Sequence, residues 1–239
     1  MDYLDFTKQR TQFLRFFYSE AAAPFVVMRQ QIEACEAPFE HPPGHEDSEP
    51  PFLNEWEQAG NALDVLGQSV ASFLSGTLQL YLKHWVEELR RWAGEEQLAA
   101  VGVGVPENPA YRKAFKKGWW KGYQAYCAKL DVNWTDSPVD LDLLDQLVLA
   151  RNSAQHPTDI TSVRARQSEA DAVRYPNAYF GDAFDIALNE HMKSGSRFLR
   201  SPRLDITPDR LSRALDEVET FCEWLDTRQP MRSPPPHSS

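Results

Sequence analysis

The longest regular pattern of apolar residues runs from about Glu55 to Ala93 and predicts a single long helix. Projected at 100° per residue, its apolar side chains fall within about half of the helix circumference. They are Leu66, Val70, Phe73, Leu74, Leu78, Tyr81, Trp85, Leu89 and Trp92. Unbroken, this helix would span about 50 to 60 Å at 1.5 Å per residue, and Gly67 or Gly76 offers a place to bend.

Helical patterns also open and close the chain. The first covers residues 3–35, where Pro24 is expected to kink or divide the helix because proline lacks a backbone N–H. Its apolar stripe comprises Phe6, Phe13, Leu14 and Phe17. The last helix has Thr207 as its N-cap and Pro208 in its first turn. Its apolar positions, at alternating steps of four and three, are Leu211, Leu215, Val218, Cys222 and Leu225.

Residues 111–130 predict a helix with one aromatic and one basic face. The aromatic face holds Tyr111, Phe115, Trp119 and Tyr126. The basic face holds Arg112, Lys113, Lys116, Lys117 and Lys121, with Trp120 among them. Cations beside an exposed indole can bind single-stranded RNA through phosphate contacts and base stacking. We therefore take Lys113, Lys116, Lys117, Trp120 and Lys121 as candidate RNA-binding residues. A solvated lysine face opposite an aromatic core face is an equally open interpretation.

The segment 139–155 predicts a helix with a clear start and a clear end. Ser137 is its expected N-cap, Pro138 its first helical residue, and Asp140 follows three positions after the cap. Its inward-facing residues are Leu141, Leu144, Leu147 and Val148. Pro157 disfavours helical geometry at His156, so this imidazole is expected at the fraying end of the helix.

The remaining segments have weaker patterns. A short helix is expected from Gly181 or Asp182 to Gly195, and a small β-hairpin around residues 196–206 is left open. The proline-rich stretch 36–52 predicts a loop. Its possible metal ligands, which we do not favour because nothing arranges them into a coordination geometry, are His41, His45, Glu46 and Asp47. Together these segments predict an all-α helical bundle with loop insertions.

Composition narrows the function classes. No apolar run is long enough to span a membrane, and the N-terminus lacks the order of a signal peptide, so we expect a soluble cytoplasmic protein. The net charge of −10 argues against broad nucleic-acid binding, although it permits a small cationic site. Cys35, Cys127 and Cys222 are widely spaced and are expected to be reduced, mostly buried thiols. We expect neither a metal nor a cofactor.

The sequence RNSAQHP, residues 151–157, ends the 139–155 helix with an arginine and a histidine five positions apart. A chain with this many arginines and histidines is expected to contain such a pair by chance, so the spacing alone carries no weight. Arg232 and His237 have the same spacing, but they lie in a proline-rich tail. What distinguishes Arg151 and His156 is the apolar helix before them, the asparagine after the arginine and the proline after the histidine.

RNSAQH at the end of an apolar helix resembles the R-x4-6-H motif, often RNxxxH, of the HEPN superfamily. The long preceding helix and the extended piece leading into the last helix are also similar to that family's arrangement. The resemblance covers about residues 55–156 and 204–227. It implies an all-helical, usually dimeric domain in which two motifs face each other across a cleft and cleave RNA without metal. In this chain it assigns catalysis to Arg151 and His156, with Asn152 orienting the imidazole or the substrate.

The chemistry of RNA cleavage suits these residue types. Attack by the adjacent 2′-hydroxyl needs a base for its proton, a cation for the phosphorane and an acid for the leaving 5′-oxygen. An imidazole can hold or give a proton near neutral pH. A guanidinium offers a planar fork to the phosphate oxygens. A second His156 from a two-fold partner would supply the other proton-transfer group.

The resemblance also predicts the domain organisation. We expect one HEPN-like domain over residues 1–227, with an N-terminal extension at 1–50, a core at about 55–156 and 204–227, and an insertion at 157–203. Residues 228–239 predict a disordered tail. Arg164, Arg166 and Arg174 would extend a phosphate track or belong to a solvated loop.

Function and partners remain expectations at this point. We expect a metal-independent endoribonuclease and homodimer acting in stress response or phage defence, with an RNA substrate and an antitoxin or regulatory protein as a further partner. Many toxin-type members carry a tyrosine two positions after the motif histidine, where this chain has Thr158, so pairing with the corresponding antitoxin is not favoured. The alternatives are a catalytically silent module that binds a nucleotide, RNA or protein, and a purely structural dimer subunit.

Overall fold

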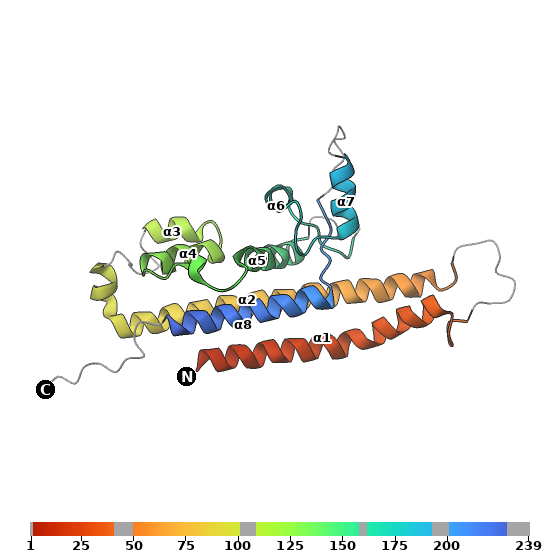
Figure 1. Ribbon diagram of the computed structural model, residues 1–239, viewed down its shortest axis with the longest axis horizontal. Coiled ribbons are helices and arrows are strands. Elements are labelled where there is room, and N and C mark those ends of the chain that lie inside the picture. Colours follow the sequence, from red (N-terminus) through yellow and green to blue (C-terminus); the bar gives the residue numbers. More distant parts are fainter. Residues whose placement is uncertain (1, 41–49, 101–108, 158–161, 193–200, 229–239) are drawn as a thin grey trace. The chain divides into compact units, whose positions relative to one another are not determined.

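The computed structural model describes residues 2–40, 50–100, 109–157, 162–192 and 201–228 (Figure 1). These residues form helices, connections and two isolated β-bridges, which confirms the all-α fold class. The helices are α1 (Tyr3–Ala34), α2 (Leu53–Ala100), α3 (Pro109–Phe115), α4 (Trp119–Lys129), the 3-10 helix η1 (Trp134–Asp136), α5 (Leu141–Gln155), α6 (Glu169–Arg174), α7 (Ala183–Met192) and α8 (Pro208–Thr227). Within the described ranges, no helix combines the length and the apolar character that a membrane crossing requires.

The chain divides into two compact units, each described here by itself. Unit 1 comprises Met1–Thr11, Leu74–Val148 and Arg213–Ser239. Unit 2 comprises Gln12–Phe73 and Leu149–Ser212. These boundaries differ from those of the predicted core, extension and insertion, and the predicted single domain stays a prediction.

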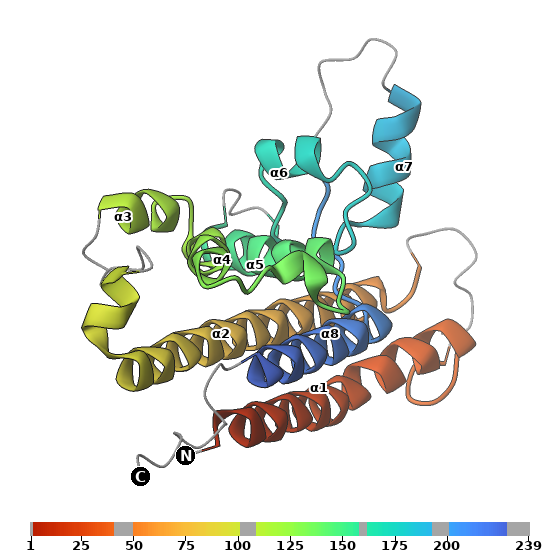
Figure 2. The same ribbon diagram turned by 60° about the vertical axis from the view of Figure 1, so that its left-hand side comes forward.

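In unit 1 the second half of α2 runs beside α8 (Figures 1 and 2). Two hydrogen bonds join these helices: the hydroxyl of Tyr81 donates to the carbonyl of Cys222 at 2.9 Å, and the indole of Trp85 donates to the carbonyl of Leu225 at 3.1 Å. Each satisfies a polar atom of a buried aromatic side chain. The apolar positions predicted for α8 are all buried.

Three aromatic rings form the centre of unit 1. The ring centroids of Trp120 and Trp134 lie 4.5 Å apart, and that of Trp134 lies 4.9 Å from Phe221. All three side chains are buried. The cluster joins α4, η1 and α8, and burying aromatic side chains of this size contributes a large share of a core's stability.

The predicted helix over residues 111–130 is wrong, because the chain breaks at Gly118. This glycine has φ of 101°, a region that other residues rarely adopt, and it separates α3 from α4. The two helices pack against each other, and a Cβ at Gly122 would lie 2.5 Å from the ring of Phe115. Two packed helices therefore replace the predicted single amphipathic helix. Gly118 allows the turn between them, and Gly122 allows the ring of Phe115 to approach α4 closely.

Helix α1 is continuous through Pro24, but its predicted apolar stripe is wrong. Phe6, Phe13 and Phe17 are exposed, and of the predicted stripe only Leu14 is buried. The buried face comprises Thr7, Thr11, Leu14, Tyr18 and Ala22. The two threonine hydroxyls donate to carbonyls of their own helix, so these side chains can be buried without an unpaired polar group.

Helix α2 confirms the predicted long helix and extends beyond it at both ends. Seven members of the predicted stripe are buried or half-buried, but Phe73 is 57% exposed, and the side chain of Trp92 lies outside the described residues. Gly67 gives the helix a close approach rather than a bend. A Cβ at this position would lie 2.7 Å from the carbonyl oxygen of Ile206.

In unit 2, ion pairs hold the connections between α5 and α8, where the sequence pattern was weakest. Arg164 bridges Asp64 of α2 and Asp182, the latter at 2.9 Å. Arg203 donates two hydrogen bonds to the carboxylate of Asp185 in α7, at 2.9 and 3.0 Å. Bidentate pairs of this kind fix orientation as well as charge.

The described part of the 196–206 segment does not fold on itself as a hairpin. Arg203 and Leu204 form isolated bridges to Arg166 and Gly181, respectively. The segment therefore pairs with residues from two other connections, and both bridges lie within unit 2. Residues 193–200 lie outside the described residues, as do the candidate metal-binding loop at 41–49 and the tail from 229 onward.

Helix caps were predicted with mixed success. Asp140, not Ser137, caps α5: its carboxylate accepts the backbone N–H of Leu143 at 3.0 Å. The hydroxyl of Ser137 instead donates to the carbonyl of Trp134 and closes η1. Thr207 caps α8 as predicted, and Asp182 caps the short helix predicted as 181–195, which is α7. The end predicted at Gly195 lies outside the described residues.

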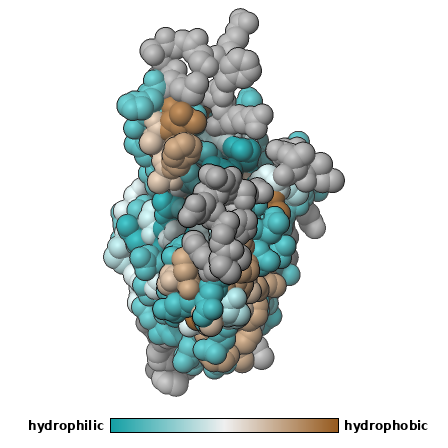
Figure 3. Space-filling model, turned by 90° about the vertical axis from the view of Figure 1, so that its right-hand side faces the viewer, coloured by the Kyte–Doolittle hydropathy of each residue, from teal (hydrophilic) through white to brown (hydrophobic). Residues whose placement is uncertain are grey.

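Helix α7 exposes apolar side chains. Phe184 is 70% exposed and Leu188 is 45% exposed. The apolar atoms near the top of Figure 3 lie on this helix. Phe184 and Leu188 are four positions apart, so they lie on the same face of α7.

Candidate functional site

The motif residues lie where α5 ends. Helix α5 has its last residue at Gln155, and the backbone N–H of His156 donates to the carbonyl of Asn152 at 3.0 Å. Pro157 has no N–H to continue the ladder. His156 lies just outside the helix, as expected, and it is exposed.

Arg151 and Asn152 are joined to each other. A guanidinium nitrogen of Arg151 donates to the side-chain oxygen of Asn152 at 3.0 Å. Asn152 is exposed and Arg151 is half-buried. The amide therefore orients the guanidinium, whereas its predicted contact with the imidazole is absent from the hydrogen bonds of the described residues.

Arg151 differs from three other arginines of unit 2 in its side-chain partner. Arg164, Arg203 and Arg210 each pair with at least one aspartate. Among the described residues, no carboxylate forms an ion pair with Arg151. A guanidinium that is positioned but not neutralised keeps its charge for an external anion.

A groove of about 420 Å³ in unit 2 reaches the last turn of α5. Its α5 wall consists of Ala154 and Gln155, two of the four residues between the arginine and the histidine of the motif. The remaining lining residues are Val65, Gln68, Ser69, Ser72, Phe73 and Val163. The hydroxyls of Ser69 and Ser72 donate to carbonyls of their own helix, so the groove offers mainly apolar surface beside the motif.

The candidate RNA-binding residues divide into three groups. Lys113, Lys116 and Lys117 are exposed, as the sequence predicts. Lys121 lies 3.9 Å from the buried carboxylate of Asp145. Trp120 requires a correction, because it is 3% exposed and packs against Trp134, so no indole is available there for base stacking.

The sequence permits a phosphate track or a solvated loop for the three arginines after the motif, and two of these arginines are instead held in ion pairs. Arg164 is held by Asp64 and Asp182, and Arg166 lies 3.8 Å from the carboxylate of Asp185. Arg174 is exposed, with its guanidinium carbon 4.7 Å from the ring centroid of Tyr175. These ion pairs could not be predicted from local patterns, because the aspartates come from distant positions in the chain.

The remaining candidate groups are accounted for by packing. His84 stacks on Tyr3, with centroids 4.5 Å apart, and its ring lies 3.2 Å from Glu87, which fits a residue at the edge of the core. Burial raises the pKa of Cys127 to about 12, so this thiol is not a nucleophile near neutral pH. Cys222 is also buried and Cys35 is exposed, so two of the three reduced thiols are buried, which agrees with the expectation of mostly buried thiols. No cluster of metal-binding side chains occurs in the described ranges.

Comparisons with protein-family models, with curated proteins and with solved structures found no match. The case for a function therefore rests on the residues and their geometry, together with the motif resemblance.

Proposed function

We propose that the protein is a metal-independent endoribonuclease of HEPN type in which Arg151 and His156 act on the scissile phosphodiester. The observation that carries the proposal is the state of these two side chains at the end of α5. His156 is exposed, and Arg151 is held by the neutral side chain of Asn152 at 3.0 Å. A purely structural pair would instead be buried against its own chain.

Each residue has a defined part in the proposed reaction. The 2′-hydroxyl loses its proton to a base, its oxygen forms a bond to phosphorus, and the bond from phosphorus to the 5′-oxygen breaks. A proton returns to that leaving oxygen from an acid. His156 serves one of these proton transfers, and Arg151 stabilises the charge of the phosphorane through its fork of N–H donors. The products carry 2′,3′-cyclic phosphate and 5′-hydroxyl ends.

A two-fold homodimer completes the proposed site. One imidazole cannot act as base and acid in the same step, so His156 of a second subunit supplies the other group. Two-fold contacts are isologous, so the same end of α5 is available from both subunits. RNA is the substrate, and an antitoxin or regulatory protein is a further proposed partner in stress response or phage defence. A cytoplasmic location belongs to the same proposal.

The experiment compares RNA cleavage by the wild-type protein and His156→Ala in the presence of EDTA. We expect the wild-type protein to cleave single-stranded RNA and the variant to lose at least about 100-fold in rate, the lower range of positioned acid–base catalysis. His191→Ala is the matched control, because His191 is an exposed histidine at the end of α7 in the same unit. Full activity of His156→Ala, or an equal loss in both variants, would refute the assignment.

A catalytically silent RNA-binding module is the second candidate. The observation that favours it is the set of exposed lysines Lys113, Lys116 and Lys117. If the wild-type protein cuts no RNA but binds it, and reversing these charges weakens binding, this candidate replaces the first. Phosphate contacts of this type also make the affinity fall as salt is added.

A further inference from the structure

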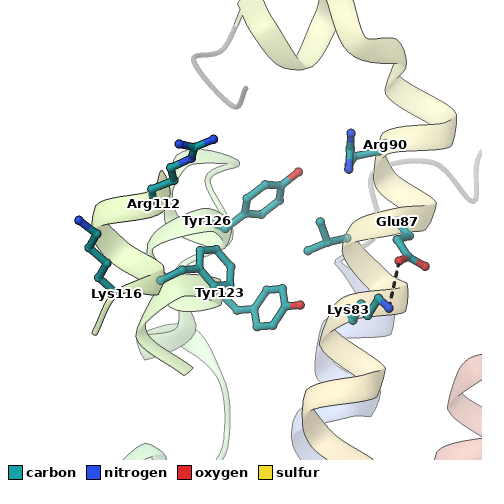
Figure 4. A pocket seen from close by; sticks show the side chains of 9 residues that line it. Lys83, Glu87, Arg90, Arg112, Lys116, Tyr123 and Tyr126 are labelled. Atoms are coloured by element: carbon teal, nitrogen blue, oxygen red, sulfur yellow. Dashed lines mark ion pairs between the residues drawn. The ribbon is translucent and has the colours of Figure 1, made fainter. Parts of the chain in front are cut away.

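A pocket of about 610 Å³ in unit 1 lies outside the proposed site, with α2 on one side and α3 and α4 on the other (Figure 4). The ammonium of Lys116 points away from this pocket, and Lys83 lies 3.9 Å from the carboxylate of Glu87. Tyr126, on its α4 wall, is buried. These groups are directed into solvent, paired with each other or packed in the core, so they define no ligand.

Helix α1 carries apolar side chains on a face that the fold leaves exposed. They are Phe6, Phe13, Phe16, Phe17 and Val27. The four phenylalanines leave on the order of 400 Å² of apolar surface in water, taking about 150 to 250 Å² for each side chain. Monomeric proteins rarely expose more than about this much apolar surface in one place, and larger exposed patches mark interaction sites.

The exposed face follows a regular pattern along α1, which is continuous over these positions. Exposed residues recur at alternating steps of four and three: Phe6, Arg10, Phe13, Phe17, Glu20 and Pro24. Such spacing aligns side chains in one stripe, through which a helix packs lengthwise against another helix. The rings of Phe13 and Phe17 lie at the middle of this stripe, with 6.1 Å between their centroids.

The stripe is complementary to a second copy of itself. Arg10 lies three positions before Phe13, and Glu20 lies three positions after Phe17. When two copies run antiparallel, Phe13 of each meets Phe17 of the other, and Arg10 of each meets Glu20 of the other. Each contact then occurs twice, because a two-fold contact is isologous. Parallel copies would instead bring like charges together, which disfavours that orientation.

The two charges of the stripe are not used within the chain. Among the described residues, neither Arg10 nor Glu20 takes part in an ion pair. Other cations of α1 are held by α8: Lys8 lies 2.7 Å from the carboxylate of Glu223, and Arg15 donates to the hydroxyl of Ser212 at 3.1 Å. Arg10 and Glu20 therefore keep their charges for a partner, where complementary charges set orientation more than affinity.

We infer that α1 binds α1 of a second copy of this chain in an antiparallel pair, with Phe13 and Phe17 at the centre and Arg10 against Glu20 on either side. A standard interface buries about 800 Å² of each partner, so the phenylalanines supply about half and flanking polar residues form the rim. A lipid surface fits less well, because it would place the carboxylate of Glu20 against acyl chains or anionic head groups.

This contact goes beyond the proposed function. Helix α1 lies outside the segments that resemble the HEPN superfamily, residues 55–156 and 204–227, so the two-fold cleft expected from that resemblance does not imply it. The inference concerns association alone and does not rest on RNA cleavage.

The test is analytical ultracentrifugation of the full chain over a range of concentrations. We expect the wild-type protein to dimerise and Phe13→Glu to raise the Kd of the dimer at least about 100-fold, because it places a carboxylate against Phe17 twice in each dimer. Phe184→Glu is the matched control, since Phe184 is an exposed phenylalanine of α7. We expect this control to change the Kd by less than about threefold. Circular dichroism checks that each variant folds.

Charge reversal tests the antiparallel register without touching the phenylalanines. We expect Arg10→Glu and Glu20→Arg each to raise the Kd at least about fivefold, because each creates two contacts between like charges. The double variant Arg10→Glu/Glu20→Arg restores opposite charges, so we expect a Kd within about threefold of the wild-type value. A role of either residue within its own chain would not produce this recovery.

The other outcomes are distinct. A wild-type protein that stays monomeric would overturn the inference, as would equal weakening by Phe13→Glu and Phe184→Glu, or a double variant that dimerises no better than the single ones. If the monomer floats with phosphatidylcholine–phosphatidylserine vesicles and Phe13→Glu does not, the face binds lipid instead. A dimer that Phe13→Glu leaves intact is held elsewhere, which overturns this inference and not the proposed ribonuclease. Absence of RNA cleavage would leave the result of sedimentation unchanged.

Discussion

At the scale of single residues, the candidate catalytic arginine differs from other arginines of unit 2 because its side-chain partner is a neutral amide and not a carboxylate. Two other arginines of unit 2 form ion pairs with aspartates: Arg164 with Asp64 and Asp182, and Arg203 with Asp185. Arg151 contacts only the neutral amide of Asn152 among the polar side chains of the described residues. A guanidinium in that state is oriented without being neutralised, which is the condition that phosphate binding requires.

Replacing Arg151 by lysine tests whether the guanidinium geometry matters. We expect Arg151→Lys to lower the rate of RNA cleavage at least about tenfold, because an ammonium keeps the charge but loses the planar fork. Arg174→Lys is the matched control, since Arg174 is an exposed arginine of the same unit whose guanidinium lies over the ring of Tyr175. Equal rates for Arg151→Lys and the wild-type protein would contradict the proposed contact with phosphate oxygens.

Asp185 gives a prediction about stability and pH. Burial by itself raises the pKa of Asp185, but hydrogen bonds from Arg203 and the charge of Arg166 bring the net pKa below the usual 3.8. A lowered pKa in the folded state means that Asp185 stabilises the fold above its unfolded pKa and loses this effect as pH falls through the folded value. We expect Asp185→Asn to lower the free energy of unfolding at pH 7 by about 1 to 3 kcal/mol, the range for hydrogen bonds to charged groups.

The same variant should respond less to acid than the wild-type protein. Below about pH 4 the wild-type protein loses the contribution of Asp185, whereas Asp185→Asn has none to lose. Urea unfolding at pH 7, 4 and 3 measures the difference, with the exposed Glu169→Gln as control. A difference in stability between wild type and Asp185→Asn that persists undiminished at pH 3 would show that the charge of Asp185 is not what stabilises the fold. The pKa of Asp64 shifts in the opposite direction to that of Asp185, because burial raises it more than Arg164 lowers it.

At the scale of helices, the two glycines of α2 have different roles. A Cβ at Gly67 would lie 2.7 Å from the backbone oxygen of Ile206, whereas nothing lies within 4 Å of a Cβ at Gly76. Substitution by alanine improves the helix propensity equally at both positions. The difference between the two changes in the free energy of unfolding therefore measures the effect of the close approach at Gly67.

We expect Gly76→Ala to raise the free energy of unfolding by about 0.5 to 1 kcal/mol. We expect Gly67→Ala to lower it by about 1 to 3 kcal/mol, because backbone must move to admit the methyl group. Thermal or urea unfolding of the two variants checks both signs. Equal stabilisation by both substitutions would mean that α2 and the segment at Ile206 are not in contact.

The helices themselves were largely predictable, because apolar periodicity marks them directly. The sequence predicted α1, α2, α5, α7 and α8 with their approximate ranges. It failed where a single residue overrides the pattern, as at Gly118, whose positive φ ends one helix and begins another. It also predicted the wrong buried face of α1, because periodicity does not show that the threonine face is buried while the phenylalanines are exposed.

The candidate site was predictable only in part. The position of His156 outside the helix followed from Pro157, a local effect. The contact between Arg151 and Asn152 joins adjacent residues, but it depends on side-chain conformations that the sequence pattern does not specify. The groove beside the motif depends on tertiary structure, so no local pattern could indicate it. The burial of Trp120 shows the same limit, because a helix projection cannot identify which side faces the core.

At the scale of the whole molecule, the proposed mechanism requires two subunits. We expect the protein to sediment as a dimer and a mixture of wild-type and His156→Ala chains to lose more activity than its wild-type content predicts. If both imidazoles are required and subunits exchange at random, a mixture with a wild-type fraction of about one third keeps only about one ninth of the activity. Activity proportional to the wild-type fraction would show that a single chain is sufficient.

The central claim is that the end of α5 cleaves RNA through the 2′-hydroxyl, and product analysis tests it most directly. Mass spectrometry of an RNA oligonucleotide incubated with the wild-type protein in EDTA should detect fragments with 2′,3′-cyclic phosphate ends. The same fragments should be absent with His156→Ala and with an oligonucleotide that is 2′-O-methylated at the cleaved nucleotide. An intact oligonucleotide after incubation with the wild-type protein, or the same cyclic ends produced by His156→Ala, would contradict the account.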